Sequence, residues 1–223
     1  MIIDLQIMTI MNVLILGSGS YVFGEGQNYG TIFPALIEFS KSQNLDITIA
    51  IRSKSSINKV RQRAEFLMKT CPANGIRSLT VIPFLSDKSS LSTYIKSSLF
   101  NCSIIALPDH VHYEYCRFSL DHKLPFLVVK PFTLTTDHAS SLVRLSSQSG
   151  IPGFVEFHKR FDRQARLAQQ SISNGSLGNL LYSFTEYSQQ KKNPLTVFKS
   201  WSSQTNIFSY LAVHYVDLFY FIS

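Results

Sequence analysis

Short apolar runs alternate along the chain with longer stretches in which apolar residues recur every three or four positions. A run of about 4 to 8 apolar residues before a turn is typical of a buried parallel strand, and the longer spacing is typical of an amphipathic helix. The predicted strands are 12–16, 45–51, 79–83, 103–107, 126–129 and 152–157. The predicted helices are 31–41, 56–70, 89–99, 112–122 and 136–149. This alternation predicts a doubly wound α/β domain built on a parallel sheet.

The pattern changes near residues 155–160. A charged helix is predicted over 160–173, a turn at Gly175 and Gly178, a strand over 180–187 and a helix over 210–222. We therefore predict two domains, 1–155 and 156–223.

Composition narrows the class of protein. Hydrophobic residues make up 45% and charged residues 16%, which excludes a disordered or fibrous chain. The net charge is +7, but the excess of Lys and Arg over Asp and Glu is spread evenly, 10 to 7 over residues 1–111 and 11 to 7 over 112–223. Nucleic-acid binding is not expected without a basic patch, whereas an anionic small ligand is compatible with this charge.

Cysteine usage and the opening residues bear on location. Cys71, Cys102 and Cys116 are odd in number and widely separated, so we expect neither a disulfide framework nor a metal site. The opening stretch carries Asp4 and no Lys or Arg before its apolar residues, so it is a poor signal peptide. No apolar run reaches the about 18 residues of a membrane span. These features predict a soluble, cytoplasmic protein with no membrane segment.

The first predicted strand ends in the glycine turn Gly17-Ser18-Gly19. In a dinucleotide-binding fold such a turn brings the backbone close to a pyrophosphate, and a third glycine lets the following helix pack closely. Here Val22 stands where that third glycine would be, and Gly30 begins the predicted helix after an enlarged loop over 20–29. The glycines of this stretch, including Gly30, are candidates for holding a phosphate, and a merely flexible loop is the alternative.

A second candidate follows the second predicted strand, at Arg52-Ser53-Lys54. An acidic residue at this place holds the ribose 2′-hydroxyl of NAD, whereas an arginine accommodates the 2′-phosphate of NADP. A guanidinium and two further polar side chains suit a phosphate, so NADP is preferred over NAD. The alternative is a solvated basic turn.

Later stretches carry a family resemblance. The sequence CSIIALPDHVHYEYCRFSLDHKLPFLVVKPFTLT, which contains Pro108, Asp109, His112 and the Lys130-Pro131 pair, resembles the Gfo/Idh/MocA family of NAD(P)-dependent oxidoreductases. The stretches GIPGFVEFHKRFD, NGSLGNLLYSF and AVHYVDLFYF follow in the order of that family. The resemblance implies a Rossmann-type domain followed by an α+β substrate domain, here partial, whose open sheet covers the active site and commonly forms a homo-oligomer.

The resemblance also implies roles for individual residues. Lys130 matches the family's active-site lysine, His214 matches a histidine at the oxidised carbon of the substrate, and Pro108 and His112 lie in the stretch close to the cofactor. The implied substrate is a sugar, cyclitol or related polyol. Oxidation of its alcohol needs a base for the hydroxyl proton and benefits from a nearby ammonium, which suits these residue types. Without the resemblance, Lys130 reads as a surface lysine and His214 as a hydrogen-bonded helix histidine.

Several positions depart from the family pattern. Val129 replaces a glutamate, Asp109 replaces an asparagine near the cofactor, and Tyr210 stands where a carboxylate often precedes the histidine by four residues. A tyrosine does not supply that anion, so Asp217 is the expected substitute. The chain also stops earlier than family members generally do. A catalytically silent dinucleotide-binding regulatory protein, or a truncated remnant of such an enzyme, is therefore the alternative to an active oxidoreductase.

Overall fold

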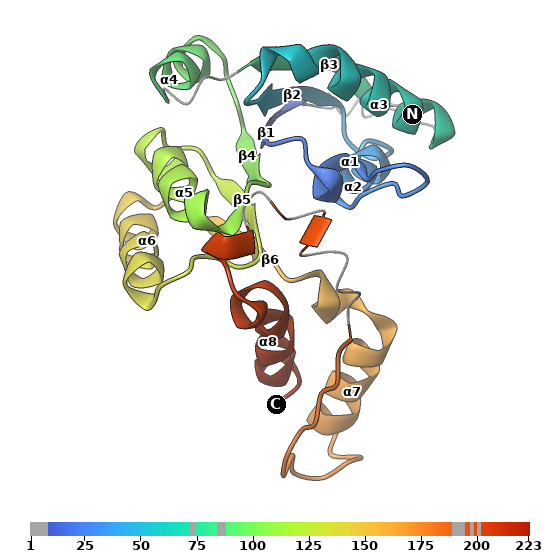
Figure 1. The fold of residues 1–223 in the computed structure, drawn as a ribbon. Helices are drawn as coiled ribbons and strands as arrows, with labels where there is room; N and C mark the ends of the chain where they lie inside the picture. The colour runs from blue at the N-terminus through green and yellow to red at the C-terminus, as the bar shows by residue number, and fades with distance from the viewer. Residues whose placement is uncertain (1–8, 72–74, 84–87, 189–194, 197–198, 200–201) are drawn as a thin grey trace, which may run out of the picture.

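A computed structural model of the chain describes residues 9–71, 75–83, 88–188, 195, 196, 199 and 202–223, so residues 1–8 of the opening stretch lie outside it. Six parallel strands form one sheet in the order β3-β2-β1-β4-β5-β6 (Figure 1). The strands are β1 (Met11–Leu16), β2 (Leu45–Ile51), β3 (Ile76–Pro83), β4 (Cys102–Ile105), β5 (Phe126–Val129) and β6 (Gly153–Glu156). This confirms the predicted doubly wound α/β fold and its parallel sheet.

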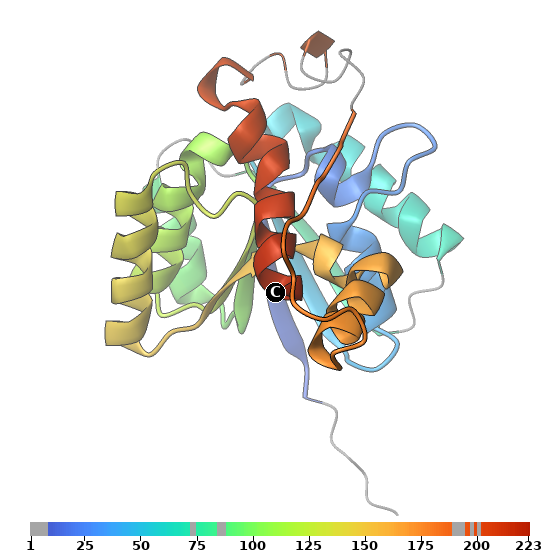
Figure 2. The same cartoon turned by 90° about the horizontal axis from the view of Figure 1, so that it is seen from below.

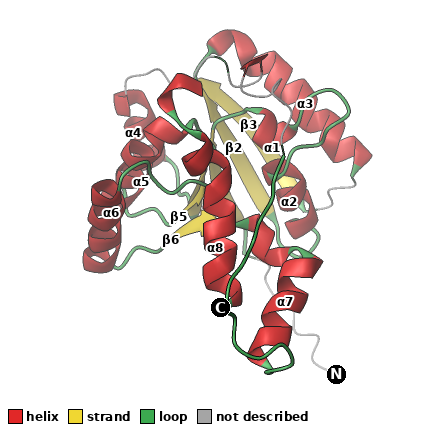
Figure 3. Cartoon of the chain, turned by 60° about the horizontal axis from the view of Figure 1, so that its bottom comes forward, coloured by secondary structure: helices red, strands yellow, loops and turns green. Residues whose placement is uncertain are grey.

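Helices cover both faces of the sheet (Figure 3). The helices of this part of the chain are α1 (Ser20–Phe23), α2 (Ile32–Phe39), α3 (Ile57–Thr70), α4 (Lys88–Ser97), α5 (His112–Asp121) and α6 (Thr136–Ser149). One core joins α1, α2 and α3 to the sheet, and a second core on the other face joins α4, α5 and α6 to it. The strand order runs in opposite directions in the two halves of the sheet, and crossovers of one handedness then place their helices on opposite faces.

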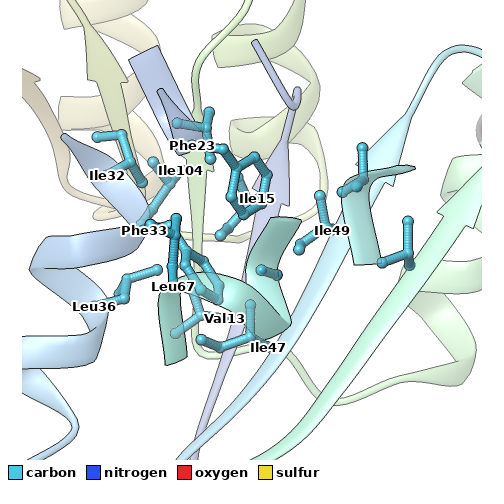
Figure 4. Packing of buried hydrophobic residues seen from close by; sticks show 14 of the residues in the cluster. Val13, Ile15, Phe23, Ile32, Phe33, Leu36, Ile47, Ile49, Leu67 and Ile104 are labelled. Carbon is cyan, nitrogen blue, oxygen red and sulfur yellow. The ribbon is translucent and has the colours of Figure 1, made fainter. Parts of the chain in front are cut away.

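The first core explains why the central strands read as continuous apolar runs. Val13 and Ile15 of β1 and Ile47 and Ile49 of β2 point to one face, where they pack around Phe33 (Figure 4). The intervening residues of β1 point to the other face, so the strand is buried on both sides. The carboxyl ends of β1 and β4, which are hydrogen-bonded neighbours, are thereby fixed side by side.

The glycine turn is followed by a helix and not by the loop that we predicted over 20–29. Ser20–Phe23 forms α1, and Val22, at the place of the third glycine, is fully buried. A loop then connects α1 to α2. Gly30, near the end of this loop, has a φ of 75°, and an added Cβ would lie 2.5 Å from the backbone nitrogen of Gly24. Four residues are too few for a helix to be recognised by periodicity, which is why this helix was missed.

The remaining residues run from β6 to a pair of helices that lie side by side (Figures 1 and 3). A 3₁₀ turn over His158–Phe161 precedes α7 (Arg163–Ser173), and a π-helical turn over Phe208–Ala212 leads into α8 (Val213–Ile222). The division into domains at residue 155 stays a prediction. Within the described residues, no helix is long and apolar enough to cross a membrane.

The strand predicted over 180–187 is wrong, because this segment is extended without belonging to a sheet. It runs alongside α8 (Figure 2), and the rings of Tyr187 and Tyr215 lie 5.6 Å apart. Leu181, Tyr182 and Phe184 are 88%, 82% and 83% exposed. The segment has a strand-like composition, but a strand also needs a hydrogen-bonded neighbour, which the described residues do not give it.

Candidate active site

One cavity of about 540 Å³ lies across the carboxyl ends of the strands, where the order reverses between β1 and β4. Ligands of doubly wound proteins bind at this switch point, and the volume is in the usual range of ligand sites, about 300 to 1,000 Å³. Of the residues predicted from the sequence, the cavity wall contains Gly17, Gly19, Arg52, Pro108, Lys130 and His214. Gly30, Ser53, Lys54 and His112 do not line it.

The two glycines of the turn have different roles in the structure. Gly17 has a φ of 111°, and an added Cβ would lie 2.2 Å from the carbonyl oxygen of Ala106 at the end of β4. Glycine is therefore required there by the fold itself. At Gly19 an added Cβ would meet no atom within 4 Å, so this backbone is open on the side of the Cβ. That openness allows a ligand in the cavity to approach the turn closely.

Arg52 stands at one end of the cavity, directly after β2, with an exposed side chain. Ser53 and Lys54 are also exposed and lead into a 3₁₀ turn over Lys54–Ser56. The Ser53 hydroxyl is hydrogen-bonded to that of Ser55, with 2.7 Å between the oxygens. Arg52 is thus the member of this group that the cavity reaches.

His112 lies behind the cavity wall, where it is fully buried. Its Nδ1 is 2.6 Å from the carbonyl oxygen of Pro131, and its Nε2 is 2.8 Å from that of Leu107. Burial lowers the pKa of His112, while the two carbonyls oppose that shift. The imidazole ties the start of α5 to the turn after Lys130, so it supports the site from behind.

Asp109 is the buried carboxyl group of the wall. It is 5% exposed, and the Thr205 hydroxyl donates a 2.8 Å hydrogen bond to it. Burial raises the pKa of Asp109, and the hydrogen bond from Thr205 lowers it. Through this contact, the segment before α8 is fastened over the cavity.

Lys130, which follows β5, meets the same segment. Its Nζ lies 3.8 Å from the centroid of the Tyr210 ring and donates a hydrogen bond to the Tyr210 carbonyl oxygen. Burial lowers the pKa of Lys130, whereas the carboxylates of Asp109 and Glu156 raise it. Burial also raises the pKa of Tyr210 to about 12, so this side chain stays uncharged, as its residue type predicts.

His214 on α8 completes this end of the cavity. It is 6% exposed, and its Nδ1 is buried without a hydrogen-bond partner among the described residues. Burial, followed by the positive charge of Lys130 and the neighbouring His158, lowers the pKa of His214 to about 4. The imidazole is therefore neutral at physiological pH.

Asp217 does not orient His214 as we expected. Both of its oxygens accept hydrogen bonds from Arg160, at 2.8 Å from Nε and 2.5 Å from the terminal nitrogen. Arg160 binds the carboxylate in a bidentate manner, because its planar guanidinium donates a hydrogen bond to each of the two oxygens. The ion pair instead fastens α8 to the 3₁₀ turn that follows β6.

Sequence reasoning missed three further residues at this end, Tyr21, Glu156 and His158. The Tyr21 hydroxyl donates a 2.6 Å hydrogen bond to Glu156 and lies 3.0 Å from His158 Nδ1. Glu156 also lies 3.0 Å from His158 Nδ1. Glu156 and His158 stand two positions apart at the end of the strand predicted over 152–157, and this spacing could have indicated that both side chains point to the same side. No group of three potential metal ligands occurs within the part of the chain that the structure describes.

Comparison with known proteins gives sequence relatives of limited extent. No protein-family model matches the chain. An uncharacterised oxidoreductase of Schizosaccharomyces pombe is 29% identical over 105 residues, which are 47% of this chain and 28% of that protein. Inositol 2-dehydrogenase 1 of Mycolicibacterium vanbaalenii is 32% identical over 79 residues, 35% of this chain and 23% of that protein.

Solved structures match over nearly the whole chain. Levoglucosan dehydrogenase in complex with NADH has a TM-score of 0.67 at 18% identity, covering 96% of this chain and 54% of that one. The chain has the fold of the Gfo/Idh/MocA-type oxidoreductases. The WlbA dehydrogenase of Thermus thermophilus, in complex with NAD and UDP-GlcNAcA, has a TM-score of 0.66 at 11% identity and covers 95% and 62% of the two chains. The chain thus spans little more than half of these Gfo/Idh/MocA-type structures.

Proposed function

We propose that this protein is an NAD(P)-dependent oxidoreductase that transfers a hydride between a nicotinamide cofactor and a sugar, cyclitol or related polyol. The observation that carries the proposal is that the Gly17-Ser18-Gly19 turn, Arg52, and the pair Lys130 and His214 line one and the same cavity. The relative named inositol 2-dehydrogenase and the structural neighbour named levoglucosan dehydrogenase support a polyol or sugar substrate.

The residues present fit a dinucleotide. The open backbone at Gly19 would hold the pyrophosphate, and Arg52 at the end of β2 would hold a ribose 2′-phosphate, which favours NADP over NAD. The nicotinamide supplies a hydride acceptor when bound. Lys130 lies at the other end of the cavity, where its ammonium would stabilise the negative charge that develops on the substrate hydroxyl. His214 would contact the same hydroxyl.

Thermal melting with NADPH and NADH tests the proposal, since a ligand that binds only the native state raises its stability. We expect a larger shift with NADPH. Arg52→Ala should weaken NADPH binding by about 10- to 100-fold, the contribution of hydrogen bonds to a charged group, with little effect on NADH. Arg61→Ala on the exposed face of α3 is the matched control. Cooperative melting with no shift by either cofactor would overturn the proposal.

A catalytically silent dinucleotide-binding protein is the second candidate. It is favoured by the engagement of the Lys130 ammonium with Tyr210, together with the Thr205 contact to Asp109 that fastens the same segment over the cavity. This candidate predicts cofactor binding without turnover. Turnover of myo-inositol or levoglucosan that is lost in Lys130→Met would exclude it. Assembly into a homo-oligomer and a cytoplasmic location remain predictions from the sequence.

A further inference from the structure

Three side chains from separate elements meet at the edge of the cavity. Tyr21 comes from α1, Glu156 from the end of β6 and His158 from the 3₁₀ turn that follows it. The His158 Nδ1 lies 3.0 Å from the Tyr21 hydroxyl and 3.0 Å from one Glu156 oxygen, and the Tyr21 hydroxyl donates a 2.6 Å hydrogen bond to the other Glu156 oxygen. Glu156 is mostly buried, with 13% of its side chain exposed.

These contacts select one tautomer of His158. Burial and the hydrogen bond to Glu156 raise the pKa of Tyr21, so the hydroxyl stays protonated and donates a hydrogen bond to the carboxylate. Both oxygens that face Nδ1 then act as acceptors, and Nδ1 must carry the imidazole proton. The lone pair therefore lies on Nε2. A carboxylate on Nδ1 orients a histidine base in the same way in serine hydrolases.

The oriented imidazole belongs to the catalytic end of the cavity. Tyr21 and His158 line the same cavity as Lys130 and His214, and the ring centroids of the two histidines are 4.7 Å apart. His214 is a weak base, since its surroundings lower its pKa to about 4. General bases work best when their pKa is near the working pH. The ionisable groups around the two rings are Tyr21 from α1, Lys130 directly after β5, Glu156 from β6, Lys159 from the 3₁₀ turn and Tyr210 from the π-helical turn before α8.

We propose that His158 is the general base of the reaction and that Glu156 and Tyr21 are its positioning residues, an inference that rests on the proposed function. In the oxidation direction, the O–H bond of the substrate alcohol breaks and its proton goes to His158 Nε2. The electron pair of the neighbouring C–H bond leaves as hydride to the oxidised nicotinamide cofactor, which leaves a carbonyl product. The His158 side chain is 36% exposed, so the imidazolium then releases its proton to water.

The tautomer can be tested without any turnover. Nitrogen-15 NMR of the labelled full chain reports which imidazole nitrogens carry protons, and His158→Gln assigns the His158 signals. We expect a protonated Nδ1 and a bare Nε2 at neutral pH. Tyr21→Phe and Glu156→Gln should each lower the share of this tautomer. A His158 protonated at Nε2 and bare at Nδ1 would overturn the inference.

Kinetics separate this inference from the proposed function. His158→Gln should keep the melting shift with NADPH but lower kcat for myo-inositol or levoglucosan by about 100-fold or more, the usual contribution of a general base. The acid limb of its pH profile should disappear, while His214→Gln retains that limb. His138→Gln, on the exposed surface of α6, is the matched control.

The possible outcomes are distinct. Absence of cofactor binding and turnover in the unaltered protein overturns the proposed function, and this inference with it. Turnover that His158→Gln leaves unchanged, with its pH profile intact, overturns this inference alone. Loss of cooperative melting in His158→Gln would show that this variant does not fold. The tautomer of the unaltered protein then decides, because a His158 protonated at Nε2 and bare at Nδ1 would refute its role as base.

Discussion

The ion pair between Arg160 and Asp217 offers a direct test of how α8, and with it His214, is held over the sheet. Arg160 Nε lies 2.8 Å from one Asp217 oxygen, and a terminal nitrogen lies 2.5 Å from the other. Replacing Arg160 with Met removes the charge and keeps an apolar stem near the rings of Phe157 and Phe221, whose centroids are 5.6 and 5.5 Å from the guanidinium carbon. The change therefore tests the charge more than the packing.

The expected magnitude follows from the unequal exposure of the two partners. The Asp217 side chain is 8% exposed and that of Arg160 is 42% exposed. Exposed pairs contribute about 0 to 1 kcal/mol, whereas hydrogen bonds to buried charged groups contribute about 1.5 to 3 kcal/mol each. Because water screens only the arginine side, we expect a coupling energy of about 2 kcal/mol. For a chain of this size, a variant whose free energy of unfolding is lower by that amount would lose about 4 to 8 °C in Tm.

A double-mutant cycle with Arg160→Met, Asp217→Asn and the combined variant measures this energy by urea unfolding. Arg166→Met, on the exposed side of α7, controls for the loss of a positive charge. A coupling energy below about 0.5 kcal/mol would refute the reasoning, since it would show that α8 is held by other contacts.

Two further predictions concern the glycine turn and His214. Gly17→Ala should lower stability by about 2 kcal/mol or more in urea unfolding, because its Cβ would lie 2.2 Å from the Ala106 oxygen at a positive φ. Gly19→Ala, whose Cβ meets no atom within 4 Å, should unfold like the unaltered protein but lose NADPH binding. Equal stability of Gly17→Ala and Gly19→Ala would contradict the different roles assigned to the two glycines. The pKa of His214 is lowered from 6.5 to about 4 in the folded protein. Between these pH values the unfolded chain takes up a proton at His214 and the folded protein does not. The free energy of unfolding is therefore unaffected by His214 above pH 6.5 and decreases as the pH falls toward 4. This decrease, at most about 3 kcal/mol, should be absent in His214→Gln. If the free energy of unfolding of His214→Gln depends on pH between 6.5 and 4 as in the unaltered protein, this prediction is contradicted.

Several parts of the structure were predictable from local pattern. The strands β2 and β5 and the helix α6 have the predicted bounds, because a run of β-branched residues or an amphipathic stretch before Gly150 specifies them locally. Gly150 caps α6 at a φ of 70°. The glycine turn and Arg52 were also predictable, since both follow a strand whose end can be recognised in the sequence.

The sequence by itself determined the succession of strands and helices along the chain, the fold class and the residues at the ends of individual strands. The reason is that burial on both faces of a parallel sheet requires a continuous apolar run. Tertiary structure alone decided which polar side chains meet. Asp217 binds Arg160 and not His214, and His158 joins Tyr21 across 137 residues of chain. Such pairings depend on distances between separate elements, and no local spacing encodes them. The physical reason is that a hydrogen bond selects whichever partner packing brings within about 3 Å, whatever its place in the chain.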